Sequence, residues 1–193
     1  MERLNVEDYY RAAFDVLAES GSEALTINAL CEQLQVTKGS FYHHFGSMPA
    51  FVDALLEFWE SEQSAQLTAI SRAQPDATLR LGTLTDFAVA VQHASEAAIR
   101  AWARSNAEVN AVTVRVDRRR ERHVTDAIVA LGLDRPDARL LARMTINLLV
   151  GAQQRERPVD TKRLRRTFEE VQKLVFLEAD PELVAHLVGS TGG

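Results

Sequence analysis

Apolar side chains recur three and four positions apart along almost the whole chain of 193 residues. The first such segment contains Val6, Tyr9, Tyr10, Ala13, Phe14, Leu17 and Ala18. This spacing places the apolar side chains on one face of an α-helix, whereas a half-buried strand needs strict alternation. Nine Gly and five Pro residues are also few for a β-rich protein with many turns. The sequence therefore predicts an all-α fold.

Capping residues and helix breakers divide this pattern into about nine helices. Asn5, Thr26, Thr37 and Ser47 are expected to cap the first four helices, because their side-chain oxygens can accept free backbone N–H groups. The expected helices cover residues 6–20, 27–34, 38–45, 48–72, 77–93, 95–105, 108–131, 135–154 and 161–178, and a short helical turn is expected from Asp180. We expect a small N-terminal domain at residues 1–47 and a larger helical domain at residues 48–193.

Composition narrows the class of protein. Apolar residues make up 46% of the chain and charged residues 25%, which is typical of a globular protein. No run of eighteen apolar residues is present, and the N-terminus carries acids where a signal peptide needs basic residues. A cytoplasmic protein without a membrane span is expected. The single Cys31 permits no internal disulfide and lies on an apolar helix face, which favours a buried thiol.

The net charge of −5 is unevenly distributed. Residues 1–50 carry three basic and seven acidic side chains, whereas residues 100–173 carry seventeen basic and ten acidic ones. The run Arg115–Arg122 is the densest basic segment, and acidic side chains interleave with it. Within this run, one helical face carries Arg115, Arg118, Arg119 and Arg122, and the favoured interpretation is that this face is solvated and partly paired. Binding of an acidic effector, or of acidic helices of a second subunit, stays open as an alternative.

Residues 26–45 have the pattern of a helix-turn-helix, in which the second short helix enters the major groove of DNA. Gly39 and Ser40 open this helix with small side chains, so its backbone can approach the bases. Phe41 and Phe45 lie four positions apart and can hold the back of the helix against the rest of the fold. The polar side chains Lys38, Tyr42 and His43 then lie on or near the opposite side.

The segment from Leu25 to Leu55 resembles the DNA-binding module of the tetracycline-repressor (TetR) family of bacterial regulators. The pattern consists of a Thr before the second helix, a Val-Thr turn, a hydroxyl within the third helix and a Tyr-x-His-Phe ending. The matching residues are Thr26, Val36, Thr37, Ser40, Tyr42, His44 and Phe45. The rest of the chain resembles the family only as an all-helical body of suitable size.

This resemblance implies a homodimer that binds a near-palindromic double-stranded DNA operator and is released by a small-molecule effector, with repression as the expected outcome. It implies phosphate contacts at Thr26, Thr37, Tyr42 and Ser47, base contacts at Asn28, Lys38, Gly39 and Ser40, and packing or bonding close to the backbone for His44. For His43, a DNA-facing or packing role is expected. It also implies that the last two long helices form the dimer interface. The expected interface residues are Leu141, Met144, Leu148, Phe168, Val171 and Val175.

Three positions depart from the family pattern. Gln35 stands where many relatives have Gly at the turn, Met48 stands where many have a basic phosphate clamp, and the N-terminal segment is acidic. The electrostatic part of DNA binding scales with the number of phosphates neutralised, so we expect modest affinity with a shallow salt dependence. The alternative is a TetR-like helical module that binds a ligand or a protein and has weak or no DNA binding.

For the effector, polar residues on otherwise apolar faces are the only guide, since an effector pocket combines apolar walls with a few convergent polar groups. They include Thr85, Gln92 and Gln153, but His93, Trp102 and Asn147 are our candidate effector residues. Trp59, Phe87, Trp102 and Met144 are aromatic or large apolar residues that could line a pocket or simply fill the core.

No enzyme is expected. The chain has no Gly-rich phosphate loop, no nucleophile elbow and no paired metal-ligand motif. His43 and His44 are adjacent, and adjacent side chains diverge by ~100° on a helix, so they do not form a good metal site. No metal and no cofactor are predicted.

Overall fold

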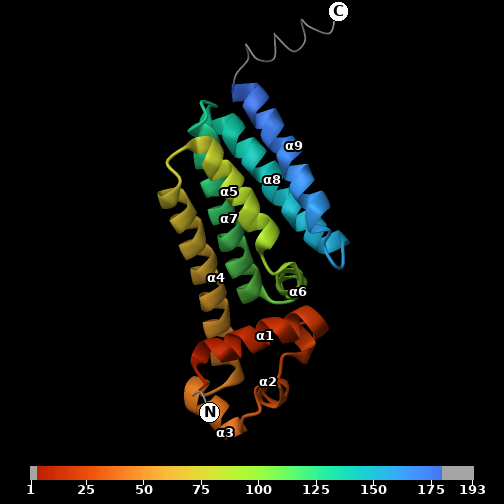
Figure 1. Cartoon of the computed structure of the whole chain (residues 1–193). Helices are drawn as coiled ribbons and strands as arrows, with labels where there is room; N and C mark the ends of the chain where they lie inside the picture. Colours follow the sequence, from red (N-terminus) through yellow and green to blue (C-terminus); the bar gives the residue numbers. More distant parts are fainter. Residues whose placement is uncertain (1–3, 180–193) are drawn as a thin grey trace, which may run out of the picture. The chain divides into compact units, whose positions relative to one another are not determined.

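The computed structural model describes residues 4–179, and every regular element in that range is helical (Figure 1). The all-α prediction is confirmed. The elements are α1 (Val6–Ser20), η1 (Ser22–Ala24), α2 (Ile27–Leu34), α3 (Lys38–Phe45), α4 (Met48–Ala73), α5 (Ala77–Ala90), α6 (His93–Ala103), α7 (Ala107–Val129), α8 (Arg135–Arg155) and α9 (Thr161–Ala179). The expected turn from Asp180 lies outside the described residues.

The expected helix boundaries differ from the observed ones mainly between α5 and α6. The sequence predicted one helix to His93, but α5 ends at Ala90, because Val91 has an extended backbone with ψ of 157°. His93 instead begins α6. The short 3-10 helix η1 between α1 and α2 was not predicted, since three residues carry no periodicity.

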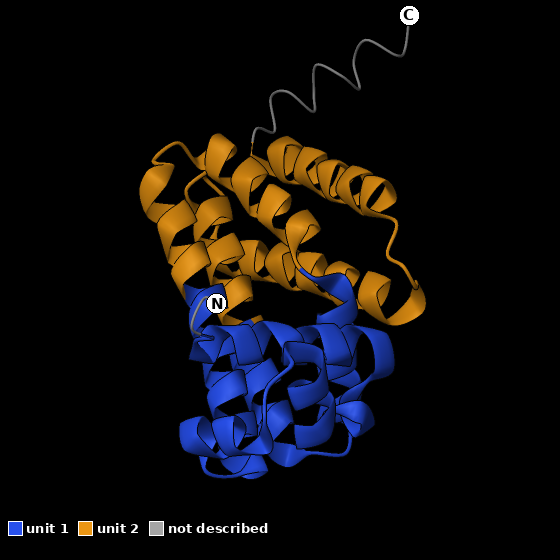
Figure 2. Ribbon diagram, turned by 60° about the horizontal axis from the view of Figure 1, so that its bottom comes forward, with its two compact units in different colours: residues 1–64, 92–116 blue, residues 65–91, 117–193 orange. Residues whose placement is uncertain are grey.

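The described chain forms two compact units (Figure 2). Unit 1 comprises residues 1–64 and 92–116, and unit 2 comprises residues 65–91 and 117–193. Both α4 and α7 begin in unit 1 and continue into unit 2. The division into a DNA-binding domain at 1–47 and an effector domain at 48–193 is a functional one and stays a prediction. No helix in residues 4–179 is long and apolar enough to span a membrane.

Helix α1 organises unit 1. Its N-terminus is closed by a capping box, in which Asn5 Oδ1 accepts from the N–H of Asp8 at 3.0 Å and Asp8 Oδ2 accepts from the N–H of Asn5 at 2.7 Å. Gly21, with φ of 78°, ends the helix. The inner face of α1 packs against α2 and α6, and the Ser95 hydroxyl donates to the carbonyl of Phe14 at 3.0 Å.

Aromatic rings fill the space between α1, α3 and α4 in unit 1. Phe45 lies 4.8 Å from Phe51 and 5.2 Å from Phe41, between ring centroids, and Tyr10 stacks on Phe58 at 4.7 Å. Such offset and edge contacts add to the stability that burial itself provides. Cys31 is buried beside this cluster, as predicted, and burial raises the pKa of its thiol.

Unit 2 is built around α5, α8 and α9 with the ends of α4 and α7. Its core includes Leu81, Leu84, Ile128 and Val175, and its α8 face presents the small residues Ala138 and Ala142. Helices α8 and α9 pack on each other, and α9 also packs on α5. Unit 2 therefore has an apolar interior of its own that is enclosed by helices.

Candidate nucleic-acid interface and effector cavity

The turn between α2 and α3 is held by Gln35 in a left-handed conformation, with φ of 54° and ψ of 42°. Among the described non-glycine residues, only Gln35 has a positive φ. The turn closes because the N–H of Val36 donates to the carbonyl of Cys31 at 2.9 Å. A left-handed side-chain-bearing residue costs about 1–2 kcal/mol, so the departure from Gly seen in the sequence has a physical cost.

Helix α3 begins at a capped N-terminus. Thr37 Oγ1 accepts from the N–H of Ser40 at 3.3 Å, as predicted from the sequence. Gly39 is exposed in the first turn, where the remaining N–H groups and the helix dipole favour an anion such as a phosphate. Phe41 is fully buried and Phe45 is half-buried, so these two rings fix the inner side of α3.

The outer side of α3 carries the polar residues that the sequence placed there. Lys38, His43 and His44 are exposed, and Tyr42 is 50% exposed although it is aromatic. The other basic residue of the described segment 4–47, Arg11, is paired with Glu7 at 3.1 Å. No acidic residue within positions 4–179 forms an ion pair with Lys38, so among the described residues its ammonium group has no charged partner.

Ser40 has a contact that sequence reasoning missed. Its Oγ lies 2.9 Å from the hydroxyl of Tyr9, and Tyr9 is fully buried in α1. Ser40 therefore ties α3 to α1 and is half-buried, in contrast to Lys38 and Gly39. The ring of His44 also lies against Tyr9, with 5.5 Å between the ring centroids.

The other candidate DNA contacts lie at neighbouring helix starts. Thr26 Oγ1 accepts from the N–H of Ala29 at 3.2 Å at the start of α2, and Ser47 Oγ accepts from the N–H of Ala50 at 3.2 Å at the start of α4. Each hydroxyl proton is still able to donate to a phosphate oxygen. Asn28 is exposed in the first turn of α2. All ten candidate residues therefore lie in unit 1, on α2, α3 or the residues that cap them and α4.

The effector candidates chosen from the sequence do not come together. His93 and Trp102 belong to unit 1, where Trp102 packs on the core, and Asn147 is exposed on α8 in unit 2. The pattern of apolar and polar residues along a helix does not distinguish a polar residue that faces a cavity from one that lies on the helix edge. None of the three residues lines the cavity described next.

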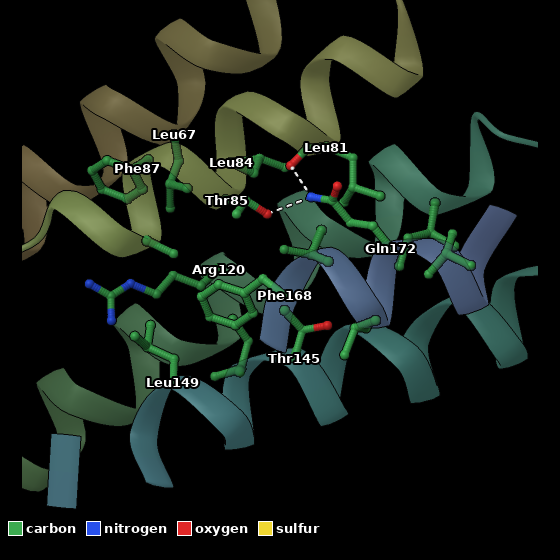
Figure 3. A pocket seen from close by; sticks show the side chains of 16 residues that line it. Leu67, Leu81, Leu84, Thr85, Phe87, Arg120, Thr145, Leu149, Phe168 and Gln172 are labelled. Atoms are coloured by element: carbon green, nitrogen blue, oxygen red, sulfur yellow. Dashed lines mark hydrogen bonds between the residues drawn. The ribbon is translucent and has the colours of Figure 1, made fainter. Parts of the chain in front are cut away.

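Unit 2 encloses a narrow cavity of about 40 Å³ between α5, α8, α9 and the ends of α4 and α7 (Figure 3). Apolar side chains make up most of its walls, including Phe87 and Phe168, and the polar wall residues are Thr85, Arg120, Thr145 and Gln172. The volume is enough to hold water. A larger ligand must displace some of the wall side chains. Phe87 and Thr85 were among the residues that the sequence suggested for a pocket.

The polar wall residues differ in how they are bonded. Gln172 Nε2 donates to Thr85 Oγ1 at 2.6 Å and to the carbonyl of Leu81 at 3.3 Å, which links α9 to α5. The hydroxyl of Thr145 donates within its own helix to the carbonyl of Leu141 at 2.9 Å. Arg120 is buried, with its guanidinium 4.0 Å from a carboxylate oxygen of Asp117.

Arg120 does not belong to the solvated face that was expected for Arg115, Arg118, Arg119 and Arg122, and it is buried. It continues the apolar row of α7, four residues after Val116 and four before Val124, so the periodicity could have identified it as an inward-facing residue. Arg115 is paired instead, with its guanidinium 2.9 and 2.7 Å from the two carboxylate oxygens of Glu60. Arg118 and Arg122 are exposed.

The residues expected at a dimer interface divide into two groups. Phe168 and Val175 are buried within unit 2 and line its cavity, so their side chains are not available to a second subunit. The prediction assigned them to the interface because an apolar stripe on a helix does not reveal which neighbour covers it. Leu141 and Val171 are half-buried, whereas Met144 and Leu148 are exposed on α8.

Unit 1 thus contains a helix-turn-helix, and the all-α unit 2 encloses a cavity. The family model described as "Bacterial regulatory proteins, tetR family" matches residues 10–55. The tetracycline repressor protein class A from transposon 1721 of Escherichia coli is 36% identical over 76 residues, which are 39% of this chain and 34% of the repressor. The match thus spans about a third of that relative.

Solved structures extend the likeness to the whole fold. A TetR-family transcriptional regulator from Streptomyces coelicolor has a TM-score of 0.74 at 17% identity, covering 90% of this chain and 95% of that one. The transcriptional regulator FadR from Bacillus subtilis, in complex with stearoyl-CoA, has a TM-score of 0.66 at 16% identity, covering 89% and 98%. Residues 10–55 thus match the family model, and the chain has the fold seen in these solved TetR-family structures.

Proposed function

We propose that this protein is a dimeric transcriptional repressor that binds a near-palindromic operator through α3 and leaves it when a small molecule occupies unit 2. The observation that carries the proposal is the exposed side of α3. Lys38, Gly39 and Tyr42 are presented at a capped helix N-terminus while Phe41 holds the helix from behind. This arrangement suits insertion into the major groove with phosphates at the helix start.

Operator binding by the purified full chain tests the proposal. We expect Lys38→Ala combined with Tyr42→Ala to weaken binding to duplexes from the protein's own promoter region at least tenfold, because the variant loses a charged contact and a hydroxyl contact. Lys38→Ala alone should lower the salt slope of binding by about 1. Glu19→Ala, on the exposed end of α1, serves as the control and should bind as the unchanged protein does. Unchanged binding by the double variant would refute the role of α3.

For the dimer, an exposed apolar row supports an α8–α9 interface. Leu140, Met144 and Leu148 lie four residues apart on α8 and are 59%, 46% and 37% exposed, and Leu174 on α9 is 56% exposed. Helices α8 and α9 pack on each other, so these residues belong to one pair of adjacent helices. Large exposed apolar side chains in one row are typical of a surface that another protein covers, and a twofold axis would pair the row with its own copy.

Sedimentation equilibrium tests whether this exposed row of α8 forms the interface. Met144→Lys and Leu148→Lys should raise the dimer dissociation constant without lowering the melting temperature of the monomer, because both side chains are already exposed. A dimer unaffected by both substitutions would place the interface elsewhere.

The acidity of the N-terminal module favours a second candidate function. Met48, in place of a basic clamp, is half-buried against the aromatic core of unit 1, and residues 1–50 carry more acidic than basic side chains. A helical module that binds a ligand or a protein, and not DNA, would need neither a basic phosphate clamp nor an excess of basic residues. Failure to shift any duplex at low salt, where electrostatic attraction is strongest, would favour this second function.

A further inference from the structure

We propose that the cavity of unit 2 binds an uncharged, largely apolar molecule of about one ring that carries a hydroxyl group, and that Gln172 and Thr85 bond this hydroxyl. The inference rests on the proposed function only in naming such a molecule as the effector. Binding itself depends on the cavity, and it is measured without DNA.

The Gln172–Thr85 pair has one acceptor and one donor left for a ligand. The carbonyl of Leu81 can only accept, which fixes the amide of Gln172 with Nε2 toward Leu81 and Thr85. Both N–H groups of Gln172 are thereby used, and its Oε1 accepts from no residue in the described chain. Thr85 Oγ1 accepts from Gln172, so its own proton is free to donate. A ligand hydroxyl within reach of both groups would donate to Gln172 Oε1 and accept from the Thr85 hydroxyl.

The remaining walls suit an apolar ring. Phe87 and Phe168 face the cavity with Leu84, Ile146 and Leu149, and Thr145 uses its hydroxyl proton within α8 (Figure 3). Aromatic side chains pack on a flat ring in offset or edge geometry. The cavity of about 40 Å³ is smaller than the ~150 Å³ of an apolar cavity that binds benzene, so even one ring enters only if wall side chains move, and a larger molecule would need a larger movement.

A carboxylate is the less favourable ligand group. It cannot donate a hydrogen bond to Gln172 Oε1, and its charge would lose hydration among apolar walls. Among the wall residues that the structure describes, Arg120 alone is charged, and Asp117 already lies 4.0 Å from its guanidinium. Figure 3 shows that guanidinium pointing away from Gln172 and Thr85. Its charge is therefore not directed at the polar end of the cavity.

Isothermal titration calorimetry of the full chain with phenol, benzene and sodium benzoate tests the proposal. We expect phenol to bind about 2- to 12-fold more tightly than benzene, which is the factor one net hydrogen bond supplies, and benzoate to bind most weakly. Gln172→Met and Thr85→Val should each reduce the preference for phenol. Two matched controls should keep it: Thr85→Ser retains the hydroxyl, and Thr145→Val removes a hydroxyl whose proton is used elsewhere.

Several results would overturn the proposal: no binding of phenol, equal binding of phenol and benzene, tightest binding of benzoate, or an unchanged preference in both Gln172→Met and Thr85→Val. Circular dichroism confirms that each variant is folded. Because these titrations contain no DNA, selective phenol binding by a chain that shifts no operator would refute the proposed function and leave this inference intact. Operator binding without phenol binding would refute this inference and leave the DNA-binding part of the proposed function intact.

Discussion

Replacing Tyr9 with Phe removes a single oxygen from the interior of unit 1 and tests whether α1 holds α3 through Ser40. The Tyr9 hydroxyl lies 2.9 Å from Ser40 Oγ, and the Tyr9 side chain is fully buried. The substitution leaves the ring in place and creates almost no cavity. The loss is therefore that of one neutral hydrogen bond, about 0.5–1.5 kcal/mol of the free energy of unfolding.

A double-mutant cycle measures this bond directly. Guanidinium unfolding of Tyr9→Phe, Ser40→Ala and the double variant should give a coupling free energy of about 0.5–1.5 kcal/mol, because each single variant already loses the bond. Tyr42→Phe is the matched control. Its hydroxyl is on an exposed side chain with no hydrogen bond in the described structure, so the expected change is within about 0.5 kcal/mol.

The same variant separates positioning from contact in DNA binding. Tyr9 is buried and cannot reach a duplex, so weaker operator binding by Tyr9→Phe would arise through the placement of α3. A coupling free energy below about 0.3 kcal/mol, which is the usual error of additivity, would refute the reasoning. Ser40 would then be free of α1 in solution and available to bases.

Three further predictions concern stability. Phe168→Ala should lower the free energy of unfolding by about 3–5 kcal/mol in a guanidinium titration, because Phe168 is buried in unit 2; a change below about 1 kcal/mol would contradict that placement. Gln35→Val should lower the free energy of unfolding by about 1 kcal/mol or more, since a β-branched side chain is strained at φ of 54°. Gln35→Asn should be tolerated, and equal melting temperatures of the two variants would contradict this prediction. Burial lowers the pKa of His123, whose Nδ1 lies 2.8 Å from the Ser71 hydroxyl. The unfolded chain therefore binds more protons than the folded one, and the free energy of unfolding should fall as the pH drops below about 6.5. His123→Asn should flatten this dependence between pH 7 and 5, and an unchanged slope would refute the reasoning.

Local chemistry made several features of unit 1 predictable. Thr26, Thr37 and Ser47 cap helices in the structure because the cap bond joins residues only three positions apart. Phe41 and Tyr42 were assigned to opposite sides of α3 because helical geometry fixes their directions. These interactions lie within one or two turns of helix, so sequence spacing describes them completely.

Contacts between distant segments were decided by tertiary structure. Nothing in the sequence joins Tyr9 to Ser40, or Gln172 to Thr85, which are 31 and 87 residues apart. Phe168 looked like an interface residue because periodicity shows that a face is apolar but not what covers it. Periodicity predicted the helices and the side of α3 that faces outward, and the residue types at the helix starts predicted the caps. Only packing decided that α9 turns Phe168 and Gln172 toward a cavity, because burial depends on which helices meet.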